Sequence, residues 1–144
     1  MTLAHETQHA KLSALLDLVP LTKPDDGSRF YAPWRDDPRP VPGLLQGAYA
    51  YLGVTDFWRR QRHVETGAAA VHAAAEFSRW CASALSVTRT LLDSGRLTRP
   101  GELFASAMAR RLERWQDEEV SAQARALARE RAERHLADWR ERNA

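Results

Sequence analysis

Cysteine is nearly absent from this chain of 144 residues, which contains only Cys81. One cysteine cannot form an intramolecular disulfide or build a metal site by itself, so we expect a reducing compartment and no stabilising disulfides. Cys81 is a candidate nucleophile, but we expect a small core residue on a helix. Long apolar runs and a secretory signal are also missing, which predicts a cytoplasmic protein with no membrane partner.

Motifs of self-sufficient catalytic sites are missing as well. The sequence has no GxSxG, HExxH or CxxC motif and no glycine-rich phosphate loop. His5 and His9 stand four residues apart and could share a helix face, but two ligands near a chain end make a weak metal site, and we expect solvated histidines there. We therefore expect that the chain alone binds no metal or cofactor and has no complete active site.

Charge of one sign is not in large excess. The formal net charge is +2, although 21 residues are basic and all of these except Lys11 and Lys23 are arginine. Guanidinium groups suit bidentate pairing with acidic oxygens at an interface, while a GC-rich genome would produce the same arginine bias. A nucleic-acid-binding protein usually concentrates positive charge on one face, so the alternating signs near the C-terminus argue against a nucleic-acid partner.

Hydrophobic periodicity predicts an all-α fold, a small helical domain without a β-barrel. Residues 2–18 carry leucines at helical spacing, and Pro20 should end that helix. Six of the seven prolines lie between Pro20 and Pro42, which predicts an extended strap. Beyond it we expect a helix of about three turns ending at Gly53. A second helix, capped by Thr55 or Asp56, should hold the three arginines of DFWRRQRH at 56–63.

Two longer helices should follow. An alanine-rich helix over residues 68–94 should end at Gly95 and bury one apolar face, made of Phe77, Trp80, Ala84, Val87, Leu91 and Leu92. Thr98 and Pro100 should start a last helix that continues unbroken from about Glu102 to Asn143. Its first half has an apolar face for the domain core, made of Leu103, Phe104, Ala107, Met108, Leu112 and Trp115. Its second half has a sparse stripe that predicts contact with another chain, with a solvated single helix as the alternative.

Four segments then occur in a characteristic order: SRFYAPW at 28–34, GAYAYLGVTDFWRRQRH at 47–63, AEFSRW at 75–80 and LLDSGRLTRPGEL at 91–103. Together they resemble the N-terminal helical part of nitrile hydratase β subunits and the small β subunit of thiocyanate hydrolase. Glu76 and Phe77 depart from two tyrosines usual in that family, and its C-terminal β-barrel has no counterpart here. The resemblance implies three regions: a helical arm and linker at 1–27, the β-like helical domain at 28–116 and a helical extension at 117–144.

The resemblance also implies a function. The chain would be the noncatalytic β-type subunit of a multi-subunit nitrile hydratase, a hydro-lyase that converts a nitrile to an amide. It would cover a cobalt(III) or iron(III) site in a partner α subunit, and a separate polypeptide would supply the β-barrel. Arg60, with Arg62 and Arg59, would hydrogen-bond to oxidised cysteine ligands of that partner, a role that suits the planar guanidinium. The alternative is that these arginines pair with Asp or Glu on neighbouring helices.

The nitrile pocket implied by the resemblance has aromatic walls. Trp80, together with Phe57 or Trp58, would line it beside the partner's metal, and plain core packing of Trp80 is the alternative. Other functions stay open: a nitrile hydratase activator resembling a metallochaperone, a thiocyanate hydrolase subunit, or a helical scaffold unrelated to nitriles.

Overall fold

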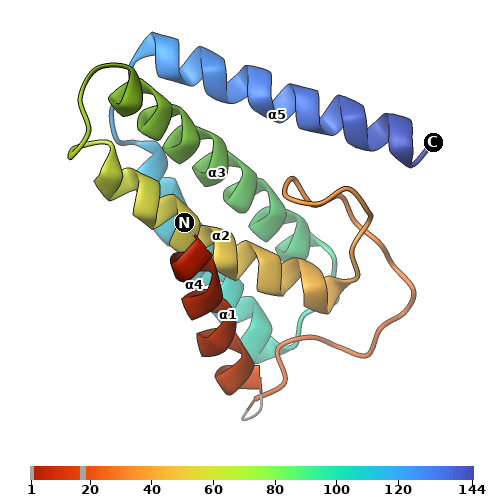
Figure 1. The fold of residues 1–144 in the computed structure, drawn as a ribbon. Coiled ribbons are helices and arrows are strands. Elements are labelled where there is room, and N and C mark those ends of the chain that lie inside the picture. Colours follow the sequence, from red (N-terminus) through yellow and green to blue (C-terminus); the bar gives the residue numbers. More distant parts are fainter. Residues whose placement is uncertain (1, 17–18) are drawn as a thin grey trace.

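The computed structural model describes residues 2–16 and 19–144, and these form an all-α protein, as predicted. Neither a strand nor a sheet occurs among them. The helices are α1 (Thr2–Leu16), α2 (Val41–Gln61), α3 (Gly67–Asp93), α4 (Arg99–Gln116) and α5 (Ala122–Arg142). Helix α3 is central: α2, α4 and α5 pack against it, and α1 packs on α2 (Figure 1). No helix in the described part of the chain is apolar over enough length to cross a membrane.

The N-terminal helix and the strap match the expectation. The helix is confirmed over Thr2–Leu16, whereas residues 17 and 18 lie outside the described residues. The strap contains no helix. One isolated bridge joins its Thr22 to Leu97, between α3 and α4, and a second joins Phe30 to Arg39 within the strap. Trp34 of the strap stacks on Tyr51 of α2, with ring centroids 4.6 Å apart. The strap is therefore attached to the rest of the protein at Thr22 and Trp34, while residues 23–27 are exposed.

Helix α2 corrects one expectation, because a single helix replaces the two predicted around Gly53. Gly53 lies inside the helix, and a Cβ there would collide with the side chain of Gln8. The glycine therefore allows α1 to approach closely and does not end the helix. Thr55 caps nothing, since its Oγ1 donates to the Tyr51 carbonyl oxygen within the same helix at 2.6 Å.

Helix α3 ends as predicted. Gly95 follows it with a φ of +69°, a conformation that glycine adopts without steric cost. The predicted apolar face is confirmed for its buried members, and only Leu92 is partly exposed. Leu12 of α1, Leu21 of the strap and Leu112 of α4 belong to the same core cluster. The core therefore combines residues from the predicted arm and from the predicted central domain.

The expectation of one unbroken C-terminal helix was wrong. Thr98 caps α4 as predicted by accepting a hydrogen bond from the Gly101 amide at 3.2 Å. The chain then leaves the helix after Gln116, and Ser121 caps α5 by accepting from the Ala124 amide at 3.2 Å. A serine followed by helix-forming residues is a start signal that our interpretation missed.

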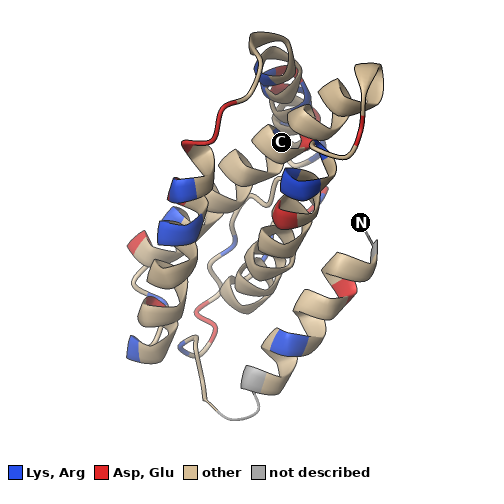
Figure 2. Ribbon diagram, turned by 90° about the vertical axis from the view of Figure 1, so that its left-hand side faces the viewer, with Lys and Arg blue, Asp and Glu red and all other residues tan. Residues whose placement is uncertain are grey.

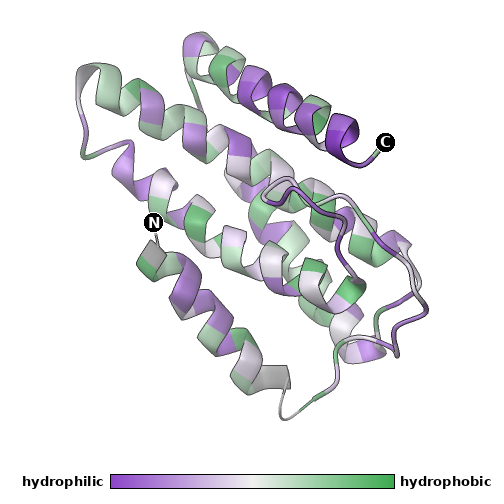
Figure 3. Ribbon diagram, turned by 45° about the vertical axis from the view of Figure 1, so that its right-hand side comes forward, coloured by the Kyte–Doolittle hydropathy of each residue, from purple (hydrophilic) through white to green (hydrophobic). Residues whose placement is uncertain are grey.

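The apolar stripe after residue 117, which we expected to contact another chain, packs on α3 of the same chain. Helix α5 folds back alongside α3, and both helices begin at the same end of the molecule (Figure 1). Ala124 and Ala128 are buried, and such small side chains let the two helices approach closely. Figure 3 shows why the sequence was misleading, since most of α5 is hydrophilic with few apolar positions.

Acidic and basic residues are spread over several helices (Figure 2).

The apolar face predicted for α4 is correct only in part. Met108, Leu112 and Trp115 are buried, but Leu103 and Ala107 are exposed. The buried face is completed by small residues, Ala105 and Ala109. Our prediction favoured the bulky leucine, whereas packing against α3 places the alanines inward.

Candidate functional site

The three arginines of the DFWRRQRH segment lie at the C-terminal end of α2, beside the connection between α4 and α5. Two of them share one carboxylate on that connection. Arg59 Nε donates to Glu118 Oε2 at 2.5 Å, and Arg62 Nη2 donates to Glu118 Oε1 at 2.7 Å. The hydrogen bond to the Glu118 carboxylate raises the pKa of Arg59. For Arg59 and Arg62, the structure thus shows the alternative role of pairing with a neighbouring acidic residue.

Arg62 is the most enclosed of the three. Its side chain is only 8% exposed, and its guanidinium lies over the ring of Phe77 at 4.3 Å from the centroid. Its Nη1 also donates to the Glu119 carbonyl oxygen at 3.0 Å. Arg62 therefore connects α2, α3 and the α4–α5 connection and has little surface left for a partner.

Arg60 differs from its two neighbours. Its side chain is 74% exposed, and its ion pair is with Asp56 of the same helix, at 2.9 Å. This i, i+4 pair orients the guanidinium along the helix surface but leaves most of it open to solvent. Arg60 is therefore the arginine of this cluster that another molecule can reach.

The predicted aromatic wall is divided between two places. Trp80 is 7% exposed, its Nε1 donates to Glu76 at 2.7 Å, and its ring contacts Tyr51. Phe57 and Trp58 contact each other, and Trp58 continues to His72 of α3. These ring contacts do not join Trp80 to Phe57 or Trp58. The burial of Trp80 favours the core alternative, whereas Phe57 and Trp58, both partly buried, stay near Arg60.

Cys81 is a core residue, as expected. It is buried on α3, and its thiol donates a weak hydrogen bond to the Leu112 carbonyl oxygen at 3.4 Å. Burial raises the pKa of the thiol to about 12. A nucleophilic cysteine requires the thiolate, so this environment opposes such a role.

The paired histidines are not simply solvated. The rings of His5 and His9 lie 4.4 Å apart, and His9 Nδ1 is 3.1 Å from Gln46 Oε1 of α2. Burial lowers the pKa of His5, and the neighbouring His9 lowers it further. The expectation that both histidines are solvated was therefore wrong, because His5 and His9 are partly buried against α2. Over the described ranges 2–16 and 19–144, no three His, Cys, Asp or Glu side chains come together as a metal site.

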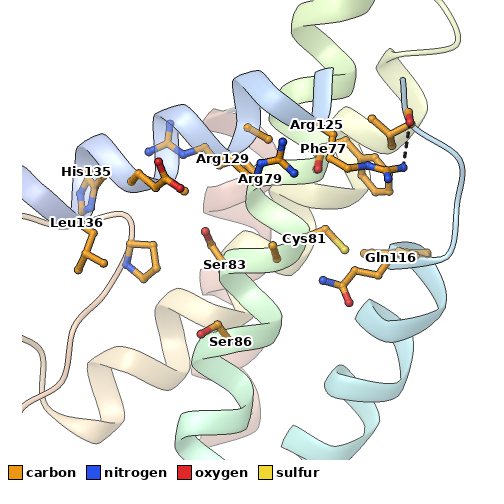
Figure 4. Close-up of a pocket in the computed structure, with 18 of the residues that line it drawn as sticks. Phe77, Arg79, Cys81, Ser83, Ser86, Gln116, Arg125, Arg129, His135 and Leu136 are labelled. Atoms are coloured by element: carbon orange, nitrogen blue, oxygen red, sulfur yellow. Dashed lines mark hydrogen bonds between the residues drawn. The ribbon is translucent and has the colours of Figure 1, made fainter. Parts of the chain in front are cut away.

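A groove that sequence analysis missed lies between α3, α5 and the α4–α5 connection (Figure 4). Its volume is about 670 Å³. Phe77 and Ser83 of α3, Trp115 of α4 and Leu136 of α5 are among its lining residues. The groove exists only because α5 folds back, so a continuous final helix could not predict it. The cap at Ser121 was the available signal.

Comparisons with family models and with curated proteins give no match. The chain fits none of the known protein-family models, and no curated protein matches it. The likeness to nitrile hydratase β subunits consequently stays a prediction, which rests on the four sequence segments.

Proposed function

We propose that this chain is a β-type subunit of a nitrile-hydratase-like enzyme, which hydrates nitriles to amides. In this proposal the chain covers a metal site carried by a partner α subunit and is inactive alone. The observation that carries the proposal is the exposed guanidinium of Arg60 at the end of a helix whose position is fixed by its neighbours. The order of the four segments within residues 28–103 supports the same function.

The arginine cluster supports a division of labour. Arg59 and Arg62 fasten the end of α2 to Glu118, and Arg60, which shares Asp56 with Arg59, keeps most of its side chain exposed. A fixed backbone and an exposed, permanently charged fork suit hydrogen bonding to anionic oxygens on another chain. Oxidised cysteine ligands of the partner α subunit would be such acceptors, so Arg60 would orient them.

The cofactor belongs to the partner in this proposal. Its cobalt(III) or iron(III) would supply Lewis-acid activation of water toward the nitrile. This chain would contribute hydrogen-bond donors and part of the pocket wall. Phe57 and Trp58, on the turn before Arg60, would contact the organic group of the substrate.

The proposal is tested on the assembled enzyme. A tagged form of the chain, purified from its native host through gel filtration, should retain a metal-binding subunit at fixed stoichiometry and should convert nitriles to amides. Assays on aromatic nitriles, aliphatic nitriles and thiocyanate separate nitrile hydratase from thiocyanate hydrolase. A chain that leaves the active enzyme during purification would instead fit an activator.

The role of Arg60 is tested by Arg60→Lys in the same complex. Lysine keeps the charge but loses the planar fork, so turnover should fall by about 10- to 100-fold while assembly is unchanged. Arg110→Lys, at an exposed position of α4, is the matched control and should be silent. Normal turnover with Arg60→Lys would remove Arg60 from the site.

A further inference from the structure

One arginine in the groove makes no ion pair with the described residues, although the charge of Glu76 acts on it. The guanidinium of Arg79, on α3, lies over the ring of Trp80 at 4.2 Å from the centroid. Its Nε is buried and has no hydrogen-bond acceptor within the described part of the chain. Burial lowers the pKa of Arg79 from its ordinary value, because the charged form has lost water. A buried donor without an acceptor carries a free-energy cost that a bound anion would remove.

The carboxylates along the groove do not serve Arg79. Glu118 is already paired with Arg59 and Arg62, as described above. Asp117 and Glu133 also line the groove, but both are exposed and can be hydrated by solvent. No ion pair within 4.0 Å joins any of these carboxylates to Arg79 among the described residues.

A second basic side chain lies across the groove from Arg79. Arg129 of α5 lines the groove, and Figure 4 shows it on the helix that faces α3. It is exposed, and none of the ion pairs of the described residues includes it. Beside Arg79, Tyr31 and His135 form a hydrogen bond of 2.7 Å between the hydroxyl and Nδ1. One part of the groove is therefore polar and basic.

Large apolar side chains also line the groove, between polar ones, and the ends of the groove limit the size of a ligand. Phe77, Trp115, Val120 and Leu136 contribute large apolar side chains. The strap lies at one end of the groove and the α4–α5 connection at the other (Figure 4). A volume of about 670 Å³ is within the usual range of small-molecule sites. Boundaries at both ends favour a compact molecule over a peptide that passes through.

We propose that this groove binds a small apolar molecule carrying one carboxylate. The carboxylate accepts hydrogen bonds from Arg79, and Arg129 adds attraction from the facing helix. The hydrocarbon body of the ligand packs on Val120 and Leu136, which are only partly buried. This site does not depend on the nitrile hydratase role, because the groove is formed by this chain alone.

The test uses two probes that differ mainly in charge, 4-phenylbutanoate and its neutral analogue 4-phenylbutanamide. Titration calorimetry and amide NMR spectra are recorded on the full chain by itself. The acid should bind about 10-fold or more tightly than the amide, because a charge-assisted hydrogen bond is lost with the amide. Amide shifts should occur at Ser83 and Ser86, which line the groove. Equal binding of the two probes, or shifts elsewhere, would overturn the proposal.

Variants separate charge from shape. Arg79→Met should weaken binding of the acid by about 10- to 100-fold, whereas Arg110→Met, at the exposed α4 position, should not change it. If Arg79→Met does not fold, Ala82→Trp serves instead: Ala82 is exposed and lines the groove, so a large side chain there should block both probes. Unchanged binding of the probes to Ala82→Trp would contradict the proposed site. So would a dimer of the chain, detected by sedimentation equilibrium, whose formation prevents binding of the probe.

Discussion

The contact between Glu118 and the two arginines of α2 should contribute more to stability than any exposed ion pair of this protein. Glu118→Gln keeps the shape of the side chain and removes its charge. Arg62, 8% exposed, would then lose its carboxylate while staying enclosed by Phe77 and the chain around Glu119. A hydrogen bond that involves a charged group contributes about 1.5–3 kcal/mol.

The solvent exposure of Glu118 reduces that figure. Its side chain is 27% exposed, so water screens part of the interaction. We expect a loss of about 2 kcal/mol in the free energy of unfolding, which corresponds to a decrease in Tm of roughly 6 to 8 °C for a domain of this size. Urea denaturation followed by circular dichroism measures the first quantity, and a thermal scan measures the second.

A matched control lies on the outer surface. Glu113 pairs with Arg89 at 3.4 Å, and their side chains are 50% and 57% exposed. Glu113→Gln should therefore cost at most about 0.5 kcal/mol. A double-mutant cycle of Glu118→Gln with Arg62→Met should show coupling, because each change removes the same interaction. Equal losses for Glu118→Gln and Glu113→Gln would refute the reasoning.

Two further predictions concern titratable groups. Burial lowers the pKa of His135, and the charge of Arg79 lowers it further. The imidazole of His135 therefore binds a proton less readily in the folded chain than in the unfolded chain. Stability should therefore decrease as the pH falls below about 6.5, the ordinary histidine pKa. His135→Gln should reduce this dependence in urea titrations and leave the part that comes from His5. Cys81, with a pKa of about 12, should resist alkylation by iodoacetamide at pH 8 in the folded protein and react once urea unfolds it. Rapid alkylation of the folded chain would show that the thiol is accessible.

Local signals predicted those helix ends that are stabilised by local interactions. Gly95 and Thr98 act through their own backbone conformation and through a hydrogen bond to a residue three positions away. Gly53 was misread because its role depends on Gln8, a residue of a different helix. The end of α4 has neither Pro nor Gly nearby. Glu118 there contacts Arg62 and Arg59, which stand 56 and 59 positions earlier in the sequence. A contact of that separation leaves no periodic pattern in the sequence.

The candidate site was predictable to a similar extent. Three crowded arginines indicated an anionic partner, but the sequence could not say that Glu118 is that partner for Arg59 and Arg62. Exposure, which distinguishes Arg60, depends on how the α4–α5 connection packs on α2. Arg79 gave no signal at all, since its missing acceptor is a property of the folded groove.

The same carboxylate links both candidate sites. Glu118 fixes the start of the connection that leads into α5, and α5 forms one wall of the groove that contains Arg79. Glu118 also holds Arg59 and Arg62, which leaves Arg60 as the exposed guanidinium. A partner that drew Glu118 away from Arg62 would therefore release the α4–α5 connection as well. Because the two sites share this element, occupation of one can change the other through the position of that connection.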